Sequence, residues 1–509
     1  MKRVVAILLC LVLLLTGCVT GNDPYVPTGD GLENEDGPQT GLPEENAKDL
    51  SIPYYKNLTL NPYLCTDYTN RALFSLLYQS LFSVDRNYRV EPILCKTYSH
   101  SQDMKVYTFF LEENATFSDG TAVTAVDVAA SLNAAWQSDY YKGRFTHITK
   151  VEASADGGVA VYLDTAYGDL PILLDIPIVK AAQVAEDRPL GSGPYVLYTA
   201  TGGESLRRRQ NWWCKPSTMA VSPETIFLTP VNSNTHIRDE FEFGDLNIVC
   251  TNPGSDLYAD YRCDREVWDC ETGIFLYLAT CVSSRVFSND AVRIALTHAI
   301  DRDSLVTNFY RGFAHSATLP ASPLSPCYNE NLANRYGYNK EAFAQAVKDA
   351  GLEGSTVVFL VNKDDSLRLR AARSIAQMLT DGGLQVQMKE VKDSEFLNAV
   401  KGRNYDLYLG QTRLSPNMDL SEFFATYGSL SWGGVNDLAA YTLSLQALEN
   451  HGNYFSLHKT VMDNGLICPV LFRTYAIYGT RGVASRLTPA RENIFYYSLG
   501  KSLADAKIA

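Results

Sequence analysis

The middle of the chain alternates apolar runs with amphipathic stretches, in the order expected for strands joined by helices. The apolar runs predict three strands, at residues 356–361, 384–391 and 405–409. Two amphipathic stretches predict the intervening helices, at residues 367–379 and 395–400. Because consecutive strands joined by helices pair in parallel with right-handed crossovers, this region predicts an α/β sheet.

The flanking regions have a different pattern, in which short strands alternate with turns. Strands are predicted at residues 52–55, 106–111, 159–163, 468–472 and 475–478. Helices are predicted at residues 71–82 and 291–300. Thr124 and Asp127 form a T-x-x-D capping box, which predicts the start of a further helix. The flanks are therefore expected to form hairpins with inserted helices.

The first eighteen residues have the pattern of a bacterial lipoprotein leader. Lys2 and Arg3 are followed by an uncharged apolar run at residues 4–15, which is too short to span a bilayer as a helix. The run ends in Leu15-Thr16-Gly17-Cys18, which resembles a lipobox. We therefore predict a signal peptide at residues 1–17 and lipidation of Cys18.

The segment after Cys18 has little apolar content. Residues 19–49 contain eight acidic side chains and one basic side chain, Lys48. Such a composition buries too little surface to offset its ordering entropy, so residues 18–50 are predicted to be a disordered acidic tether.

The whole chain is acidic and rich enough in apolar residues to bury a large core. It has 509 residues, of which 46% are hydrophobic, and a formal net charge of −13. This balance argues against a nucleic-acid binder, which needs a basic face. Nine cysteines remain besides Cys10 and Cys18, without a C-x-x-C pair. Cys263 and Cys270 could bridge a local loop, or the thiols could stay free.

A series of short motifs stands in a fixed order between about residues 55 and 480. They are Leu60-Asn-Pro, Leu77-Tyr-Gln-Ser-Leu-Phe, Tyr107-Thr-Phe-Phe-Leu, Phe117-Ser-Asp-Gly-Thr, Thr124-Ala-Val-Asp-Val, Gly191-Ser-Gly-Pro-Tyr, Arg293-Ile-Ala-Leu, Ala299-Ile-Asp-Arg and Tyr405-Asp-Leu. In this order the chain resembles the peptide/nickel-type solute-binding lipoproteins of bacterial ABC transporters, extracellular solute-binding family 5.

The resemblance implies an α/β, two-lobed periplasmic-binding-protein-like (type II) fold, with mixed sheets and a ligand cleft between the lobes. After the leader at 1–17 and the tether at 18–50, lobe I would cover 51–274. Lobe II would cover 275–467, and residues 468–509 would return to lobe I. The boundary strands near 275 and 468 would form the hinge.

The resemblance also implies a function in capture. The protein would bind a small solute, oligopeptide-like or another polar or anionic molecule, and deliver it to the permease and ATPase of an ABC transporter. A solute that touches both lobes favours the closed form by its differential affinity. The protein is expected to act as a monomer, without a cofactor or metal, on the extracytoplasmic face of the bacterial membrane, held only by its lipid.

Candidate ligand residues follow the strand at 405–409, because ligands gather beyond the carboxyl ends of parallel strands. Peptide binders of the family carry an acidic residue there, whereas this chain has Arg413. A guanidinium favours a carboxylate, a phosphate or sugar hydroxyls; alternatively, Arg413 forms an ion pair at the surface or between the lobes. The full candidate set is Tyr54, Tyr55, Gln411, Thr412, Arg413, Asn417, Tyr427, Trp432 and Asn436.

Two other classes of function are a hydrolase and a lipoprotein without a role in transport. A Ser/His/Asp hydrolase would carry a G-x-S-x-G elbow, and the sequence contains none, nor an H-E-x-x-H motif or a P-loop. A sensory or structural lipoprotein that keeps the fold without transport stays open from the sequence.

Overall fold

The computed structural model describes residues 50–219, 221–255, 257–434, 437–484 and 486–506. The predicted signal peptide, the lipidation site Cys18 and the tether up to residue 49 lie outside these residues. Residue 50, predicted as the end of the tether, is buried as the first residue of a strand. Within the described residues, no helix is both long and apolar enough to cross a membrane.

The largest sheet has seven strands, six of them in the order β12–β18–β13–β17–β15–β16, with β14 paired to β18. Their bounds are β12 (Ile248–Thr251), β13 (Glu266–Thr280), β14 (Ala314–Ser316), β15 (Thr356–Asn362), β16 (Gln385–Val391), β17 (Leu407–Arg413) and β18 (Cys468–Gly479). β15 pairs in parallel with both β16 and β17. The predicted parallel β-α-β-α-β unit is therefore confirmed, and β18 joins the two strands predicted near the carboxy terminus.

The two faces of this sheet bury different side chains, because successive residues of a strand point to opposite faces. On β13, Leu276 and Leu278 belong to a separate hydrophobic core, together with Leu379 of α10. The helices that contribute to this core are α6 (Asp290–Ala299), α7 (Arg302–Tyr310), α9 (Lys340–Asp349) and α10 (Ser366–Asp381). Full burial of each such leucine contributes about 1.5–3 kcal/mol.

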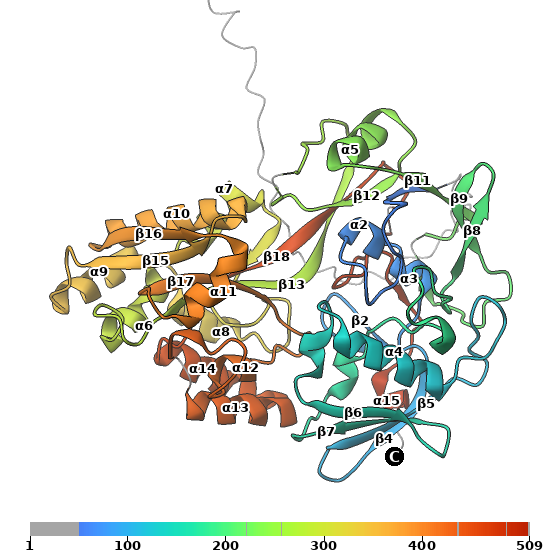
Figure 1. The fold of residues 1–509 in the computed structure, drawn as a ribbon, viewed down its shortest axis with the longest axis horizontal. Helices are drawn as coiled ribbons and strands as arrows, with labels where there is room; N and C mark the ends of the chain where they lie inside the picture. The colour runs from blue at the N-terminus through green and yellow to red at the C-terminus, as the bar shows by residue number, and fades with distance from the viewer. Residues whose placement is uncertain (1–49, 220, 256, 435–436, 485, 507–509) are drawn as a thin grey trace, which may run out of the picture. The chain divides into compact units, whose positions relative to one another are not determined.

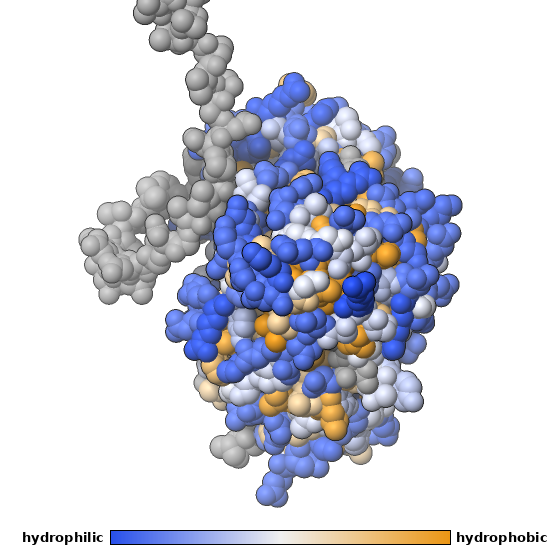
Figure 2. All heavy atoms as spheres, turned by 90° about the vertical axis from the view of Figure 1, so that its left-hand side faces the viewer, coloured by the Kyte–Doolittle hydropathy of each residue, from blue (hydrophilic) through white to orange (hydrophobic). Residues whose placement is uncertain are grey.

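The opposite face carries aromatic side chains. The ring of Tyr277 lies 5.1 Å from Phe423 and 6.0 Å from Tyr408, measured between ring centres. Four helices lie on this side: α11 (Asp393–Lys401), α12 (Ser421–Phe424), α13 (Leu438–Glu449) and α14 (Tyr454–Asp463) (Figure 1). Figure 2 shows the outer side of this part of the molecule, where hydrophilic side chains predominate, as expected for a solvent-facing surface.

Smaller sheets build the rest of the described chain. A four-stranded sheet has the order β1–β11–β9–β8, another the order β4–β5–β7–β6, and β2–β3 and β10–β19 form two-stranded pairs. The bounds are β1 (Leu50–Tyr54), β2 (Phe82–Val84), β3 (Val90–Pro92), β4 (Cys95–His100), β5 (Val106–Leu111), β6 (Ile148–Ala153), β7 (Val159–Leu163), β8 (Tyr195–Ala200), β9 (Gly203–Arg208), β10 (Thr218–Met219), β11 (Thr225–Pro230) and β19 (Tyr497–Ser498).

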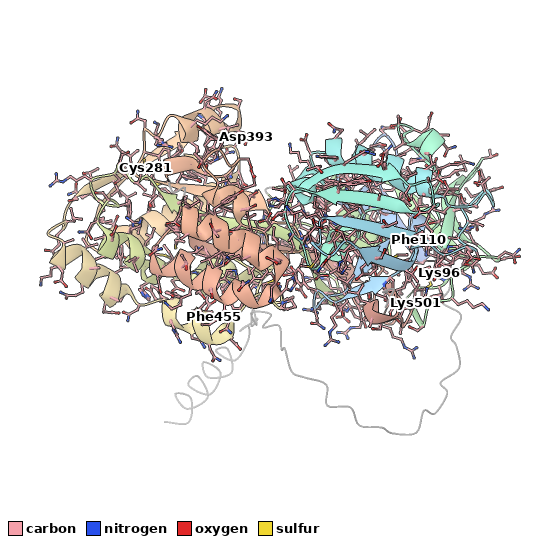
Figure 3. All side chains as sticks on the ribbon, turned by 90° about the horizontal axis from the view of Figure 1, so that it is seen from below. Lys96, Phe110, Cys281, Asp393, Phe455 and Lys501 are labelled. Carbon is pink, nitrogen blue, oxygen red and sulfur yellow. The ribbon has the colours of Figure 1, made fainter. Side chains whose placement is uncertain are left out.

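The remaining helices of the described chain are mostly short. They are α2 (Tyr68–Arg71), α3 (Phe74–Leu77), α4 (Ala125–Gln137), α5 (Asn234–Phe243), α8 (Glu330–Ala333) and α15 (Leu503–Ala506). Single 3₁₀ turns stand at η1 (Lys142–Phe145), η2 (Leu170–Leu173), η3 (Ala181–Gln183), η4 (Asn334–Tyr336), η5 (Trp432–Gly434) and η6 (His451–Asn453). The carboxy-terminal segment packs beside β4, where Lys501 Nζ lies 2.6 Å from Glu112 Oε1 (Figure 3).

Two local predictions had different outcomes. The capping box is confirmed: the Thr124 side chain accepts from Asp127 N while the Asp127 carboxylate accepts from Thr124 N. The single helix predicted at 71–82 is wrong, because the chain forms α2 and α3 and becomes extended at Tyr78. There the carbonyl of Leu77 accepts from Gly193 N at 3.0 Å instead of continuing the helix.

The long strands β13 and β18 pair with each other from Glu266 to Leu278 and run through both parts of the molecule. Their register shifts between Glu271 and Phe275, so the ladder is irregular there. All nine cysteines in the described residues are free, and eight of them are buried. Cys263 and Cys270 are therefore not bridged in this structure.

Candidate functional site: a buried, arginine-lined cavity

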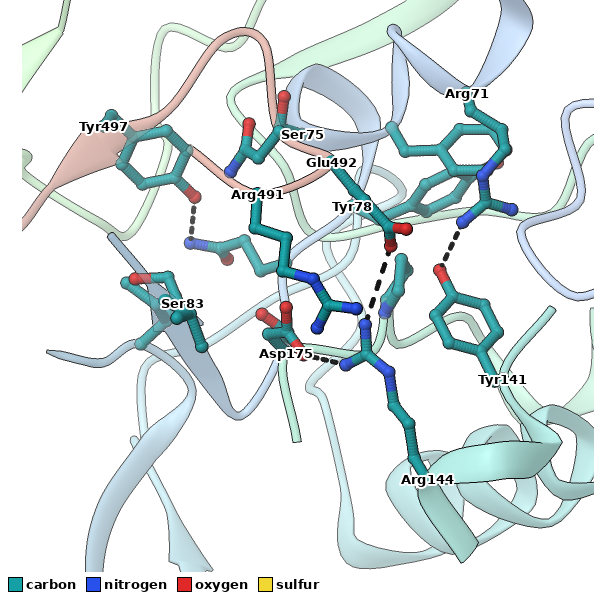
Figure 4. Close-up of a pocket in the computed structure, with 17 residues that line it drawn as sticks. Arg71, Ser75, Tyr78, Ser83, Tyr141, Arg144, Asp175, Arg491, Glu492 and Tyr497 are labelled. Carbon is teal, nitrogen blue, oxygen red and sulfur yellow. Dashed lines mark hydrogen bonds and ion pairs between the residues drawn. The ribbon is translucent and has the colours of Figure 1, made fainter. Parts of the chain in front are cut away.

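A polar cavity of about 80 Å³ lies where α2, α3 and η1 meet the segment before β19 (Figure 4). Its charged lining groups come from residues far apart in the chain. The lining residues are Arg71, Phe74, Ser75, Tyr78, Gln79, Ser80, Ser83, Val84, Ile93, Tyr141, Arg144, Asp175, Pro177, Arg491, Glu492, Asn493 and Tyr497.

Arg144 projects into the cavity from η1, the turn that follows α4 in the chain. Its Nη1 donates to the Asp175 carboxylate and, at 3.2 Å, to the carbonyl of Leu173, while Nη2 lies 3.7 Å from Glu492 Oε2. Burial lowers the pKa of Arg144 to about 9, and the positive charge of Arg491 acts in the same direction. The site therefore holds two guanidiniums close enough to repel each other.

Arg71 stands at the other side of the cavity, on α2. Its guanidinium lies 3.2 Å from the ring centre of Tyr140, and Nη2 donates to the Tyr141 hydroxyl at 2.9 Å. Nη1 donates to the carbonyls of Pro62 and Cys65 at 3.2 and 3.0 Å. Neutral oxygens and an aromatic face thus hold this guanidinium.

Arg491 is 4% exposed, and Nη2 donates to the carbonyl of Leu414 at 2.5 Å. Its Nε and Nη1 have no hydrogen-bond partner within the protein. The side chain lies against the backbone of Gly273, which has a φ of 68°. A Cβ at this position would collide with the guanidinium, so glycine is required both for the left-handed backbone and for the close approach.

Glu492 connects this segment to two arginines. Its carboxylate accepts from Arg413 and lies beside Arg144, and its backbone N donates to the carbonyl of Glu271 at 2.9 Å. The backbone of Glu492 has a φ of 57°, a conformation that side-chain-bearing residues rarely adopt. The contacts around Glu492 hold it in this conformation, as is common at binding sites.

Comparison with known proteins shows which family the chain belongs to. A profile of the bacterial extracellular solute-binding proteins, family 5 (middle region), matches residues 89–434, more than half of the chain. The chain belongs to this family.

Relatives and solved structures agree with the assignment. The chain is 24% identical to the glutathione-binding protein GsiB of Shigella flexneri over 403 residues, which are 76% of this chain and 77% of that protein. The substrate-binding protein CtaP of Listeria monocytogenes gives a TM-score of 0.69 at 17% identity, with 90% of this chain and 100% of CtaP covered. The putative peptide-binding protein AppA of Clostridium difficile gives 0.71 at 14% identity, with 88% and 98% covered.

These similarities confirm two of the predictions. The fold is the two-lobed type II fold of periplasmic binding proteins, with mixed sheets. The chain is an extracytoplasmic solute-binding protein of the kind that serves ABC transporters.

Among the predicted ligand residues of this solute-binding protein, those of β17 lie nearest the cavity. Arg413 is 27% exposed, donates to Glu492 and to the carbonyl of Thr272, and lies 4.4 Å from the ring centre of Tyr140. Gln411 Oε1 accepts from Arg473 Nη1 at 3.1 Å. Thr412 is half-buried opposite Phe275 of β13. Arg413 thus touches a cavity residue without lining the cavity itself.

The predicted tyrosines at the amino terminus lie elsewhere. Tyr54 is buried on β1 and donates to Glu204; burial and that carboxylate raise its pKa. Tyr55 is half-buried, and its hydroxyl lies 3.5 Å from Asn234 Oδ1. Neither side chain is among those that line the cavity.

The remaining candidates are dispersed around α12–α14. Asn417 is buried, and its carbonyl accepts from the Tyr454 hydroxyl. Tyr427 is 98% exposed, and Trp432 is half-buried with Lys401 Nζ 5.3 Å from its ring centre. Asn436 lies outside the described residues. Asn417, Tyr427 and Trp432 are therefore not among the side chains that line the cavity.

Sequence reasoning missed the residues that do line the cavity. Arg144, Asp175, Arg491 and Glu492 stand in short turns and irregular segments, where no hydrophobic period identifies a face. The one available signal was the charged run Arg491-Glu492 within an otherwise strand-like carboxy-terminal stretch. Among the residues that the structure describes, no group of three or more His, Cys, Asp or Glu side chains could hold a metal ion.

Proposed function

We propose that the protein captures a small polar solute at the arginine-lined cavity and hands it to an ABC transporter. The observation that carries this proposal is the buried guanidinium of Arg491, with two unpartnered donors inside a polar cavity. Buried donors are normally satisfied, and a donor left unpaired costs free energy that a bound solute recovers.

In the proposed capture, residues of lobe I line the cavity and lobe II contacts its edge. With lobe I at 51–274 and 468–509 and lobe II at 275–467, Arg413 of lobe II meets Glu492 of lobe I. Further contacts connect the same regions: Ser415 Oγ donates to the carbonyl of Gly143 at 3.0 Å, and His147 Nε2 lies 3.0 Å from Ser421 Oγ. A solute that contacts groups on both sides would favour this closed arrangement by its differential affinity.

The proposed setting is the outer face of the bacterial membrane. The leader sequence supports a lipid on Cys18 and an acidic tether that leaves the folded part free to move near the permease. The protein acts as a monomer and releases its solute chemically unchanged.

Native mass spectrometry of the purified full-length protein tests the proposal. We expect a fraction of molecules to carry a small solute that is lost after mild denaturation and refolding. A thermal-shift screen of the refolded protein should then show a rise in melting temperature with that solute, since a ligand at 100 times its Kd stabilises by about 2.7 kcal/mol. A protein that carries no solute and responds to none in the screen would contradict the proposal.

A further inference from the structure

The charges around the cavity do not balance. Counting the cavity lining and Arg413 beside it, four guanidiniums face two carboxylates: Arg71, Arg144, Arg413 and Arg491 against Asp175 and Glu492. The site therefore carries an excess of two positive charges, and the side chains that line the cavity are buried or half-buried.

The two carboxylates are already engaged. Asp175 accepts from Arg144, and Glu492 is shared between Arg144 and Arg413. Arg71 is held by carbonyls and a tyrosine hydroxyl, all neutral. Arg491 has only the carbonyl of Leu414, so its charge has no anionic partner among the described residues. A buried charge without a partner is costly unless a counter-charge binds beside it.

The position of Arg491 suits such a counter-charge. Figure 4 shows its guanidinium among the lining side chains, between Asp175 and Glu492. The amide oxygen Oδ1 of Asn493 and the hydroxyl of Ser75, which line the same cavity, are also buried without a partner. A cavity lined by both an unpartnered acceptor and an unpartnered guanidinium matches a solute that joins an acidic group to a hydrogen-bond donor.

Resting on the proposed function, we propose that the solute is a small carboxylate of net negative charge that also carries an amino or hydroxyl group. Its carboxylate accepts from Nε and Nη1 of Arg491, and its donor group serves Asn493 Oδ1. A volume of 80 Å³ accommodates about five to eight water-sized groups, so the cavity takes a small acid or the acidic end of a longer molecule.

A peptide amine is disfavoured in this cavity. An ammonium group here would face the excess positive charge of the arginines, whereas a carboxylate would neutralise part of it. The guanidinium is also the side chain best suited to carboxylate recognition.

Matched pairs of acid and amide test the charge preference on the wild-type, refolded full-length protein. The probes are L-glutamate against L-glutamine, L-malate against malamide, and alanyl-glutamate against its amide, compared by isothermal titration calorimetry. We expect at least one acid to bind ten times or more tighter than its amide. If the amides bind as tightly as the acids, the assignment is wrong while solute capture itself stands.

The solute identified by native mass spectrometry decides the case in which no pair binds. A captured solute with a carboxylate and net negative charge supports the assignment, and a neutral or cationic one overturns it. If no solute is captured and no probe binds, both this assignment and the proposed function fail.

Variants then connect the preference to Arg491. Arg491→Gln should abolish the difference between acid and amide, and Arg491→Lys, which keeps the charge, should retain part of it. Arg481→Gln is the matched control, because Arg481 is exposed and pairs with Asp264 away from the cavity. A preference for the acid that survives in folded Arg491→Gln, or in Arg491→Met should the first variant not fold, would refute the role of Arg491.

Discussion

The ion pair between Arg413 and Glu492 joins β17 to the segment that carries Arg491, and its removal should have a measurable cost. The side chains are 27% and 13% exposed, so the pair is partly shielded from water. Arg413→Met keeps the apolar stem and removes the charge, and Glu492→Gln keeps the shape of the acceptor.

The expected magnitudes follow from what each change leaves behind. Glu492→Gln leaves Arg144 and Arg413 with less counter-charge and exposes Arg144 to Arg491, so it should cost about 3 kcal/mol, the lower end for breaking a buried pair. Arg413→Met also loses the contact with the Tyr140 ring, worth about 0.5–1 kcal/mol, but Arg144 can then use Glu492 fully. We expect a cost of about 1–2 kcal/mol.

A double-mutant cycle measures the interaction itself. Urea unfolding of the wild type, both single variants and the double variant, followed by tryptophan fluorescence and far-UV circular dichroism, gives the free energies where the two probes coincide. We expect a coupling of about 1 kcal/mol between the two sites. Arg481→Met and Asp264→Asn at the exposed pair serve as controls, and we expect a far smaller coupling energy between them.

Additive effects would refute this reasoning. If the double variant is destabilised by the sum of the two single destabilisations to within about 0.5 kcal/mol, Arg413 and Glu492 are not in contact in solution. The arrangement of the lobes described here would then not be the dominant one.

Three further outcomes are expected. His147 lies 3.1 Å from Asp164 and 3.4 Å from Asp419; burial opposes its protonation, but the two carboxylates prevail and raise its pKa. The closed form should therefore be favoured below about pH 6.5 and lose this support as pH rises through the raised pKa. Small-angle scattering should show a larger radius of gyration at the higher pH in the wild type but not in His147→Gln. Gly273→Ala should destabilise the protein by about 1–2 kcal/mol and weaken solute binding, both measured by thermal shift, because it strains the backbone and displaces a guanidinium. Burial lowers the pKa of His458 to about 3, so unfolding should become easier by about 3 kcal/mol between pH 7 and pH 4, and His458→Phe should remove that part of the acid sensitivity in urea titrations.

Much of the fold could be predicted from the sequence because its elements carry a local period. The strands at 356–361 and 384–391 alternate with amphipathic helices, and the structure pairs them in parallel as predicted. The strand at 106–111 has the predicted bounds. The helix expected at 71–82 failed because tertiary contacts from Gly193 interrupt it, which no local pattern reveals.

The site was less accessible to sequence reasoning. The rule that ligands gather after parallel strands led to Arg413, which touches Glu492 at the edge of the cavity. Arg71, Arg144 and Arg491 come together only through tertiary folding, because they are more than seventy residues apart and stand at helix ends or in irregular segments. Their convergence is a property of the folded chain rather than of any motif.

The irregular stretch of β13 holds two neighbours of the cavity, Arg413 and Leu414, through its backbone carbonyls. The carbonyl of Thr272 accepts from Arg413, and the carbonyl of Gly273 accepts from Leu414 N at 3.0 Å, so both attach to the few residues where the ladder with β18 slips. Any flexing of the two lobes at this slip would displace Arg413 directly and Arg491 through the carbonyl of Leu414. Solute binding and movement of the lobes would then be coupled directly through these backbone contacts.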